Sequence, residues 1–185
     1  MAGYSEVIQT MGAMIIFSLI LLSANRMIQR NTHMQIEGEL EQEVVAVAQD
    51  IIEEGRTKEF DENSQGAAPP ANIPGDFTGS SNLGGDFSAD PTIDDDKDHD
   101  GTVERDEFDD FDDFNGWTEH ITTENGEFDI ETQVYYVTPD TYDSTGTRTT
   151  FKKMRVYITS KYLTKDNSND RTKYYLEFIR NYYAD

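Results

Sequence analysis

The chain has 185 residues, with 37 acidic and 15 basic side chains, a net charge of −22 and no cysteine. This composition excludes disulfide scaffolds, Cys-ligated zinc sites and cysteine nucleophiles. It also argues against binding to nucleic acid, which would repel so acidic a chain. The charge is uneven: residues 1–60 carry a net charge of −5, residues 61–131 carry −20 and residues 132–185 carry +3. The acidity therefore belongs to a central segment.

The N-terminal segment begins with the composition of a membrane span. Nineteen residues without a formal charge lie between Glu6 and Arg26. As a helix they extend roughly 28 Å, close to the hydrocarbon thickness of a bilayer. A cleavable signal peptide would need basic residues ahead of the apolar run, and residues 1–10 carry Glu6 as their only charge. We therefore expect residues 1–25 to lie in a membrane as a helix.

Helical periodicity continues beyond the apolar run. Apolar residues recur at spacings of four, four, three and four, at Ile36, Leu40, Val44, Val47 and Ile51. This pattern is typical of one apolar face of an amphipathic helix. No proline interrupts residues 1–68, and Gly55 is a suitable C-cap. The sequence predicts one helix over residues 1–55, hydrophobic in its first half and amphipathic in its second.

Two short motifs carry a family resemblance. With Met1 removed, Ala2-Gly3-Tyr4-Ser5-Glu6 places Glu6 at the fifth position, and EQEVVAVAQDIIEEGRTKEFDE at residues 41–62 follows the amphipathic half. Residues 1–62 thus resemble the N-terminal helix of type IV pilins and type II secretion pseudopilins, including minor pilins of the PilV type. The resemblance implies self-association into a helical filament at the cell surface, with residues 1–25 in the inner membrane before assembly and in the filament core afterwards.

The resemblance also implies a role for Glu6, which in this family neutralises the N-terminal amine of a neighbouring subunit. A carboxylate inside an apolar bundle is costly unless a cation pairs with it. The alternative is that Glu6 is a solvated residue ahead of a membrane span, where it stabilises the helix N-terminus.

The central segment contains a twelve-residue calcium-loop motif. Aspartates stand at positions 1, 3 and 5, a glycine stands at position 6 where the chain turns sharply, and a glutamate stands at position 12. Ca²⁺ takes six to eight oxygen ligands, and this EF-hand spacing supplies them. The predicted ligands are Asp96, Asp98, Asp100, Thr102 through its carbonyl, Glu104 and Glu107. The alternative is a charged loop of chance composition.

The flanks of this motif differ from those of a paired EF-hand. Residues 56–93 are rich in Gly, Pro, Ser and Asn and read as a linker or loop, which excludes a helix ahead of the motif. An exit helix from Glu104 to Phe114 is expected within the acidic segment 94–117. The arrangement resembles the isolated calcium loops of dockerin-type modules, and we expect calcium to act as a structural staple in place of the C-terminal disulfide common in pilins.

An acidic and aromatic run follows the motif. Phe108, Phe111 and Phe114 stand three apart and are expected to anchor this turn to the core. Four aspartates lie between them, and we expect a solvated face rather than a second cation site: Asp109, Asp110, Asp112 and Asp113.

The C-terminal segment, residues 118–185, predicts a small antiparallel sheet. Three runs alternate apolar and polar residues: 128–137, 150–160 and 172–182. In the second run, Met154, Val156 and Ile158 share one face. The fold class is therefore α+β, a long helix packed on an antiparallel sheet with an inserted calcium loop.

The sequence shows no catalytic motif, such as a nucleophile elbow or a phosphate-binding glycine loop. We expect a structural subunit of an extracellular type IV-like filament, with no enzymatic activity, no small-molecule substrate and no nucleic-acid partner. The alternatives are a single-pass membrane protein with a calcium-dependent extracellular binding head, or a low-abundance pseudopilin of a secretion system.

Overall fold

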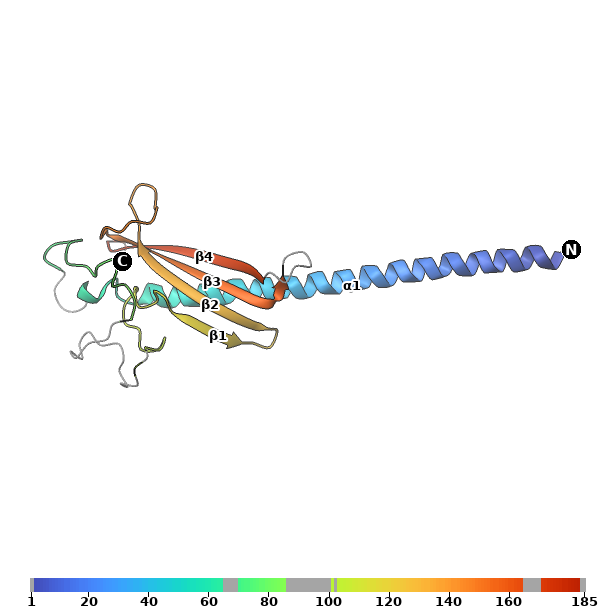
Figure 1. The fold of residues 1–185 in the computed structure, drawn as a ribbon, viewed down its shortest axis with the longest axis horizontal. Helices are drawn as coiled ribbons and strands as arrows, with labels where there is room; N and C mark the ends of the chain where they lie inside the picture. Colours follow the sequence, from blue (N-terminus) through green and yellow to red (C-terminus); the bar gives the residue numbers. More distant parts are fainter. Residues whose placement is uncertain (1, 65–69, 86–100, 102, 165–170, 184–185) are drawn as a thin grey trace. The chain divides into compact units, whose positions relative to one another are not determined.

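A computed structural model describes residues 2–64, 70–85, 101, 103–164 and 171–183 (Figure 1). The elements follow the chain in the order helix, short 3₁₀ turn and four strands. They are α1 (Ala2–Thr57), η1 (Glu62–Ser64), β1 (Thr118–Thr122), β2 (Glu127–Tyr136), β3 (Phe151–Thr164) and β4 (Arg171–Asn181). The chain divides into two compact units, unit 1 (Met1–Glu41) and unit 2 (Gln42–Asp185).

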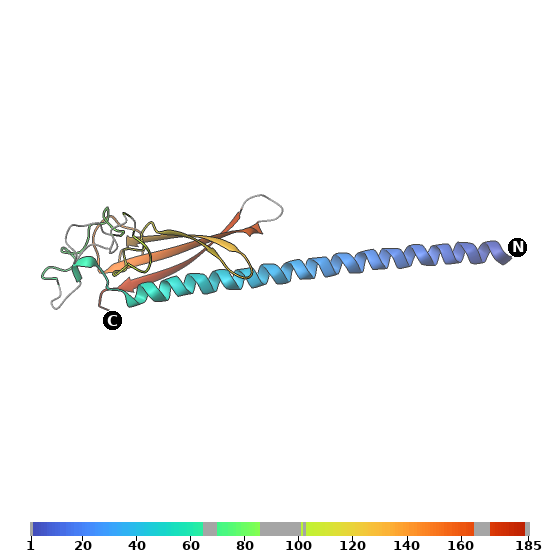
Figure 2. The ribbon, with the colours of Figure 1, turned by 90° about the horizontal axis from the view of Figure 1, so that it is seen from below.

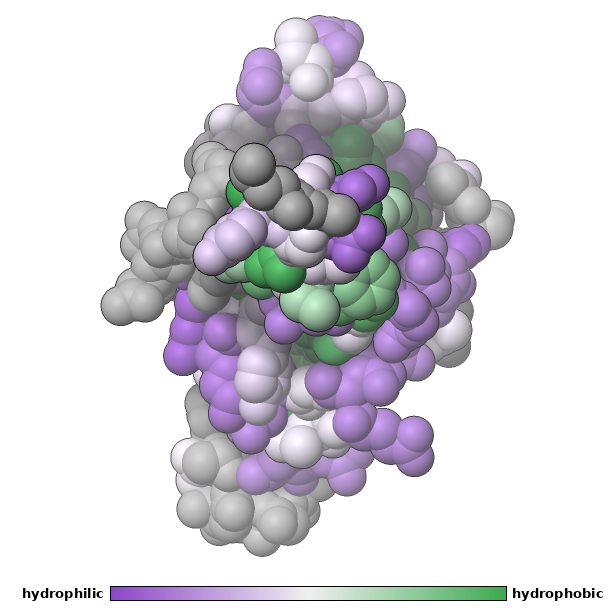
Figure 3. Space-filling model, turned by 90° about the vertical axis from the view of Figure 1, so that its right-hand side faces the viewer, coloured by the Kyte–Doolittle hydropathy of each residue, from purple (hydrophilic) through white to green (hydrophobic). Residues whose placement is uncertain are grey.

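Unit 1 consists of the N-terminal part of α1, and most of its large apolar side chains are exposed. The large apolar residues from Val7 to Leu22 have between 49% and 70% of their surface exposed. Figure 3 looks from the N-terminal side and shows hydrophobic side chains, in green, at the surface. By length and composition, α1 from Gly3 to Thr57 is the one described helix that could cross a membrane. The segment is free of proline and rich in good helix formers, which favours a helix here.

Unit 2 is built on a four-stranded antiparallel sheet in the order β1-β2-β3-β4. Each strand pairs with its neighbour in sequence, as in a meander. Figures 1 and 2 show residues 42–57 of α1 lying along one face of this sheet. The helix meets the sheet closely at Gly55, where an added Cβ would lie 2.8 Å from the terminal methyl of Met154 and 3.4 Å from the Phe111 ring.

The core of unit 2 lies between the helix and the sheet. Burial alternates along β2 and β3, so that every second side chain faces the core. The fully buried side chains come from the helix, the strands and the acidic segment, and include Val44, Ile51, Phe111, Phe114, Phe128, Met154 and Ile158. Residues 70–85 contribute Phe77 and Leu83 to a second cluster with Phe60 and Tyr136. The segment expected as a linker thus supplies core residues.

The helix and the three predicted strands are confirmed, and the fold class is α+β with a helix on an antiparallel sheet. Two local expectations are wrong. Gly55 is not a C-cap, because α1 continues to Thr57. No exit helix forms from Glu104 to Phe114: the described residues there make a succession of turns, closed by hydrogen bonds such as Asn115 N to Asp112 O at 2.8 Å. Short-range capping by aspartate side chains competes with helix formation in this run.

Candidate functional site

The residue predicted to direct assembly, Glu6, lies in the exposed first part of α1. The large hydrophobic residues near it, Tyr4, Val7 and Ile8, are 83%, 56% and 70% exposed. An exposed apolar surface of this length marks a site of contact with a membrane or with other protein chains. The sequence resemblance alone assigns a pairing role to Glu6, and that role stays a prediction.

The predicted calcium ligands are only partly described. Asp96, Asp98, Asp100 and Thr102 lie outside the described residues. Glu104 and Glu107 are described, and they close a turn in which the Glu107 amide donates to the Glu104 carbonyl at 3.0 Å and the Glu104 amide donates to Glu107 Oε2 at 3.1 Å.

Gly101, at position 6 of the motif, has a φ of +94°, the left-handed region in which glycine is favoured. Within the part of the chain that the structure describes, no cluster of three or more His, Cys, Asp or Glu side chains could hold a metal ion. Four of the six predicted ligands lie outside that part of the chain. Calcium binding therefore stays a prediction.

The acidic run is not the solvated face that its composition predicts. Asp110, Asp112 and Asp113 are 1%, 2% and 4% exposed. Their carboxylates accept backbone N–H groups of the same turn: Asp113 Oδ2 from Asp110 N at 2.8 Å, and Asp110 Oδ1 from Asp112 N at 2.6 Å. The phenylalanines between them are also buried, as expected, at 3% or less: Phe108, Phe111 and Phe114. The whole turn is thus packed into unit 2.

A buried lysine explains how these carboxylates are tolerated. Lys152 on β3 is fully buried, and its Nζ lies 2.7 Å from Asp61 Oδ2 and in contact with Asp112 Oδ1. The same Nζ donates to the Phe60 carbonyl at 2.8 Å. The aromatic rings of Phe60 and Tyr136 lie 4.7 and 5.4 Å from it. We call Lys152, Asp61, Asp110 and Asp112 the buried charge cluster.

The electrostatics of the cluster follow from one cation and three carboxyl groups in a dry site. Burial, together with the charges of Asp112 and Asp113, raises the pKa of Asp110 well above its ordinary value. Burial also raises the pKa of Asp112, although Lys152 opposes that shift. Burial lowers the pKa of Lys152, but the surrounding carboxylates outweigh it and the net shift is upward. Burial therefore favours the protonated form of Asp110.

Asp61 is held as a hydrogen-bond acceptor from several directions. Both of its carboxylate oxygens lie 3.0 Å from the Thr78 amide, and Oδ1 accepts the Asn63 amide at 3.2 Å. The Tyr136 hydroxyl lies 3.2 Å from Oδ2. Burial and the neighbouring carboxylates raise the pKa of Tyr136, so its hydroxyl keeps its proton.

The alternation of core-facing and outward-facing residues along β3 indicates one member of this cluster, Lys152. In the run that places Met154, Val156 and Ile158 on one face, Lys152 occupies the same phase and so belongs to the core face. A lysine in a buried phase requires a buried carboxylate partner. The pattern could have identified Lys152 but not its partners, because Asp61 and Asp112 lie 91 and 40 residues away along the chain.

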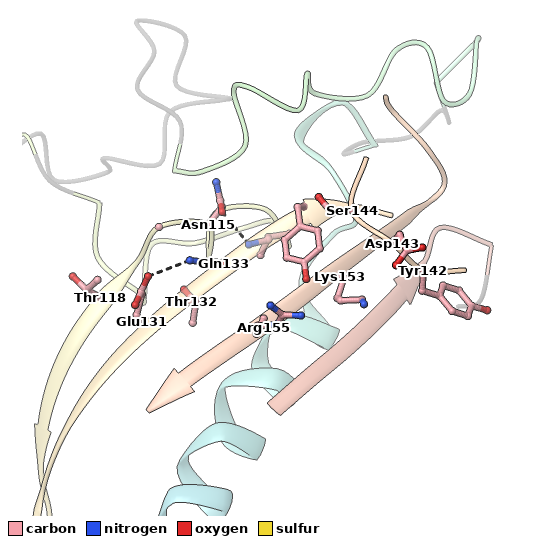
Figure 4. A pocket seen from close by; sticks show the side chains of 13 residues that line it. Asn115, Thr118, Glu131, Thr132, Gln133, Tyr142, Asp143, Ser144, Lys153 and Arg155 are labelled. Carbon is pink, nitrogen blue, oxygen red and sulfur yellow. Dashed lines mark hydrogen bonds between the residues drawn. The ribbon is translucent and has the colours of Figure 1, made fainter. Parts of the chain in front are cut away.

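The opposite face of the sheet carries a shallow polar hollow of 730 Å³ (Figure 4). Gln133 and Glu131 on β2 line it beside Lys153 and Arg155 on β3. Arg155 pairs with Glu177 on the neighbouring strand and lies within 6 Å of the rings of three tyrosines: Tyr135, Tyr157 and Tyr175. The charges here are compensated within the sheet, which suits a contact surface better than a reactive site.

A row of ion pairs on this outer face makes stability depend on pH. Hydrogen bonding to His120 and Arg171 lowers the pKa of Asp129, and hydrogen bonding to Lys173 lowers that of Glu131. A carboxyl group whose pKa is lowered by folding stabilises the folded state at pH values above its unfolded pKa. This stabilisation is lost as the pH falls through the pKa that the group has in the folded state. We expect a small fall in the urea midpoint below about pH 4.

The Asp129→Asn/Glu131→Gln double variant should show a shallower acid decline than the unmodified chain. Salt of about 1 M should reduce the difference between the two chains, because these pairs are exposed and screened. Identical pH profiles at low salt would show that the pairs do not stabilise the sheet.

Comparisons of the chain with known protein families, with curated proteins and with solved structures find no match.

Proposed function

We propose that this protein is a structural subunit of an extracellular, type IV-like helical filament, assembled through the apolar first part of α1. The observation that carries the proposal is the bare apolar surface of unit 1, where the large apolar residues from Val7 to Leu22 are at least 49% exposed. Such a surface must be covered by lipid or by other apolar helices.

Two properties of the chain suit the apolar segment first to a membrane and then to the interior of a filament. The uncharged run between Glu6 and Arg26 is long enough, at roughly 28 Å, to be held in a membrane before assembly. Helices that are apolar on all sides also pack against one another without losing a polar face. In the packed state Glu6 would enter an apolar bundle, where it needs a cation such as the N-terminal amine of a neighbouring subunit.

In this proposal unit 2 faces the outside, and calcium bound by Asp96, Asp98, Asp100, Thr102, Glu104 and Glu107 stabilises it. A folded outer unit with a compensated sheet surface suits a particle exposed to changing salt and shear. No catalytic step is assigned to it.

The experiment begins with material sheared from the surface of the native cells. The sheared fraction is pelleted, the chain is identified by mass spectrometry and its N-terminal residue is determined. Abundant recovery in a filamentous pellet supports the proposal. Recovery only from the cell membrane would contradict it and favour the single-pass membrane protein. Trace recovery at filament tips or bases would favour the pseudopilin.

A Glu6→Ala variant is expected to insert into the membrane normally and to form no filaments, because the neighbouring amine loses its anionic partner. Membrane extraction and electron microscopy of the sheared fraction measure the two properties separately. Glu39→Ala, which removes a carboxylate from the same helix beyond the apolar segment, is the matched control and should assemble. Normal filaments from Glu6→Ala would remove the pairing role.

A further inference from the structure

The buried charge cluster has the arrangement needed for a covalent cross-link. We propose that Lys152 and Asp112 condense into an intramolecular isopeptide bond, with Asp110 as the acid that transfers protons to the reacting groups. The bond would join β3 to the acidic segment at the centre of unit 2. It is independent of the filament proposal, since it concerns the interior of one chain.

The three required groups are already in place. The Lys152 amine contacts an Asp112 carboxylate oxygen, and burial with the charges of Asp112 and Asp113 raises the pKa of Asp110. The turn holds Asp110 in position, because its Oδ1 accepts the Asp112 amide at 2.6 Å. Fixed contact of nucleophile and electrophile replaces a bimolecular encounter and contributes a large share of the barrier reduction in such reactions.

Asp112, rather than Asp61, is the electrophile. Asp61 accepts hydrogen bonds from the Thr78 and Asn63 amides, which engage both of its carboxylate oxygens and fix its orientation. Asp112 instead has a carboxylic acid beside it, and protonation by that acid makes its carbonyl carbon open to attack. Asp61 Oδ2, 2.7 Å from Lys152 Nζ, is placed to remove a proton from the ammonium group.

The step balances with these four side chains alone. Lys152 gives one proton to Asp61, and Asp110 gives its proton to the Asp112 carboxylate. The neutral amine attacks Cγ of Asp112 and the Nζ–Cγ bond forms. The nitrogen gives a second proton to Asp110, which passes it to the departing hydroxyl as the Cγ–O bond breaks. The products are a neutral amide and one water, with Asp61 protonated, Asp110 ionised and nothing oxidised or reduced.

The surroundings favour condensation over hydrolysis. Lys152 and Asp61 are 0% exposed, and the Phe60 ring lies 4.7 Å from the amine nitrogen. A dry site strengthens the interactions that move the protons and keeps water from reversing the reaction. The amide also replaces an ion pair, whose desolvation is costly, by a neutral group. In a chain without cysteine, this bond would do the work of a disulfide.

The test is the mass of the full-length chain, measured under denaturing conditions after the N-terminal residue has been determined. We expect the mass to fall short of the sequence mass by one water. Proteolytic mapping should yield a branched peptide that joins Lys152 to Asp112. A wild-type chain with its full sequence mass would show an ion pair only and overturn the proposal, as would a branch from Lys152 to Asp61.

Three variants separate the cross-link from other losses of water, such as succinimide formation at Asp100-Gly101. Lys152→Arg and Asp110→Asn should both restore the full sequence mass, the first by removing the nucleophile and the second by removing the acid. Lys153→Arg, the adjacent lysine on the outer face, is the matched control and should keep the deficit. A deficit that persists in Lys152→Arg would overturn the proposal even where the wild-type mass agrees with it.

Discussion

Relative to a chain in which Lys152 and Asp112 form an ion pair and have not condensed, replacing Lys152 with alanine is expected to lower the free energy of unfolding by about 3–5 kcal/mol. Its Nζ contacts Asp61 and Asp112, which are 0% and 2% exposed, and donates to the Phe60 carbonyl. Without the ammonium group these carboxylates remain in a dry site and lose their shared cation. Denaturant titration of the full chain in detergent measures the loss.

The loss should be smaller in acid. Because burial already raises the pKa of Asp110 and Asp112, protons neutralise these carboxylates in the variant before the pH falls to the ordinary carboxyl range. Lys153→Ala, with its side chain on the outer face, is the matched control and should change stability far less. A Lys152→Ala chain as stable as this control would show that Lys152 does not hold the cluster together.

Removing calcium is expected to lower the melting temperature of the chain. At free calcium 100-fold above the dissociation constant, binding to the folded state alone stabilises it by about 2.7 kcal/mol. Differential scanning calorimetry in calcium and in chelator measures the change. Magnesium should not replace calcium, because it demands a smaller octahedral site and keeps its waters.

An Asp96→Asn/Glu107→Gln double variant should melt at the same temperature with and without calcium. Glutamine at position 107 keeps an oxygen that can accept the Glu104 amide, so the turn described there can persist. Asp94→Asn, which removes an acid just ahead of the motif, is the matched control and should retain the calcium response. Equal melting temperatures of the unmodified chain in calcium and in chelator would contradict the prediction that calcium stabilises the fold.

The regular elements could be predicted because their patterns are local. The uninterrupted apolar and amphipathic periodicity predicts α1 to within a few residues of its ends, Ala2 and Thr57. Period-two alternation likewise locates β2, β3 and β4. The strand β1 was missed, because its residues are exposed or half-buried with no alternation and it is held as an edge strand by backbone pairing with β2.

The sequence by itself determined the α+β fold class, the long helix and the bare apolar segment, since each depends on periodicity within one stretch of chain. It also supplied the calcium motif, whose spacing is local. Whether the acidic run is buried or solvated was decided by the tertiary structure alone. Its composition predicts solvation, but Lys152, which lies 40 residues beyond Asp112, brings a cation into contact with it. A buried charge is tolerated only where a group of opposite charge contacts it. Here that group is distant in the sequence, and the contact depends on how the sheet, the turn and the end of α1 pack together.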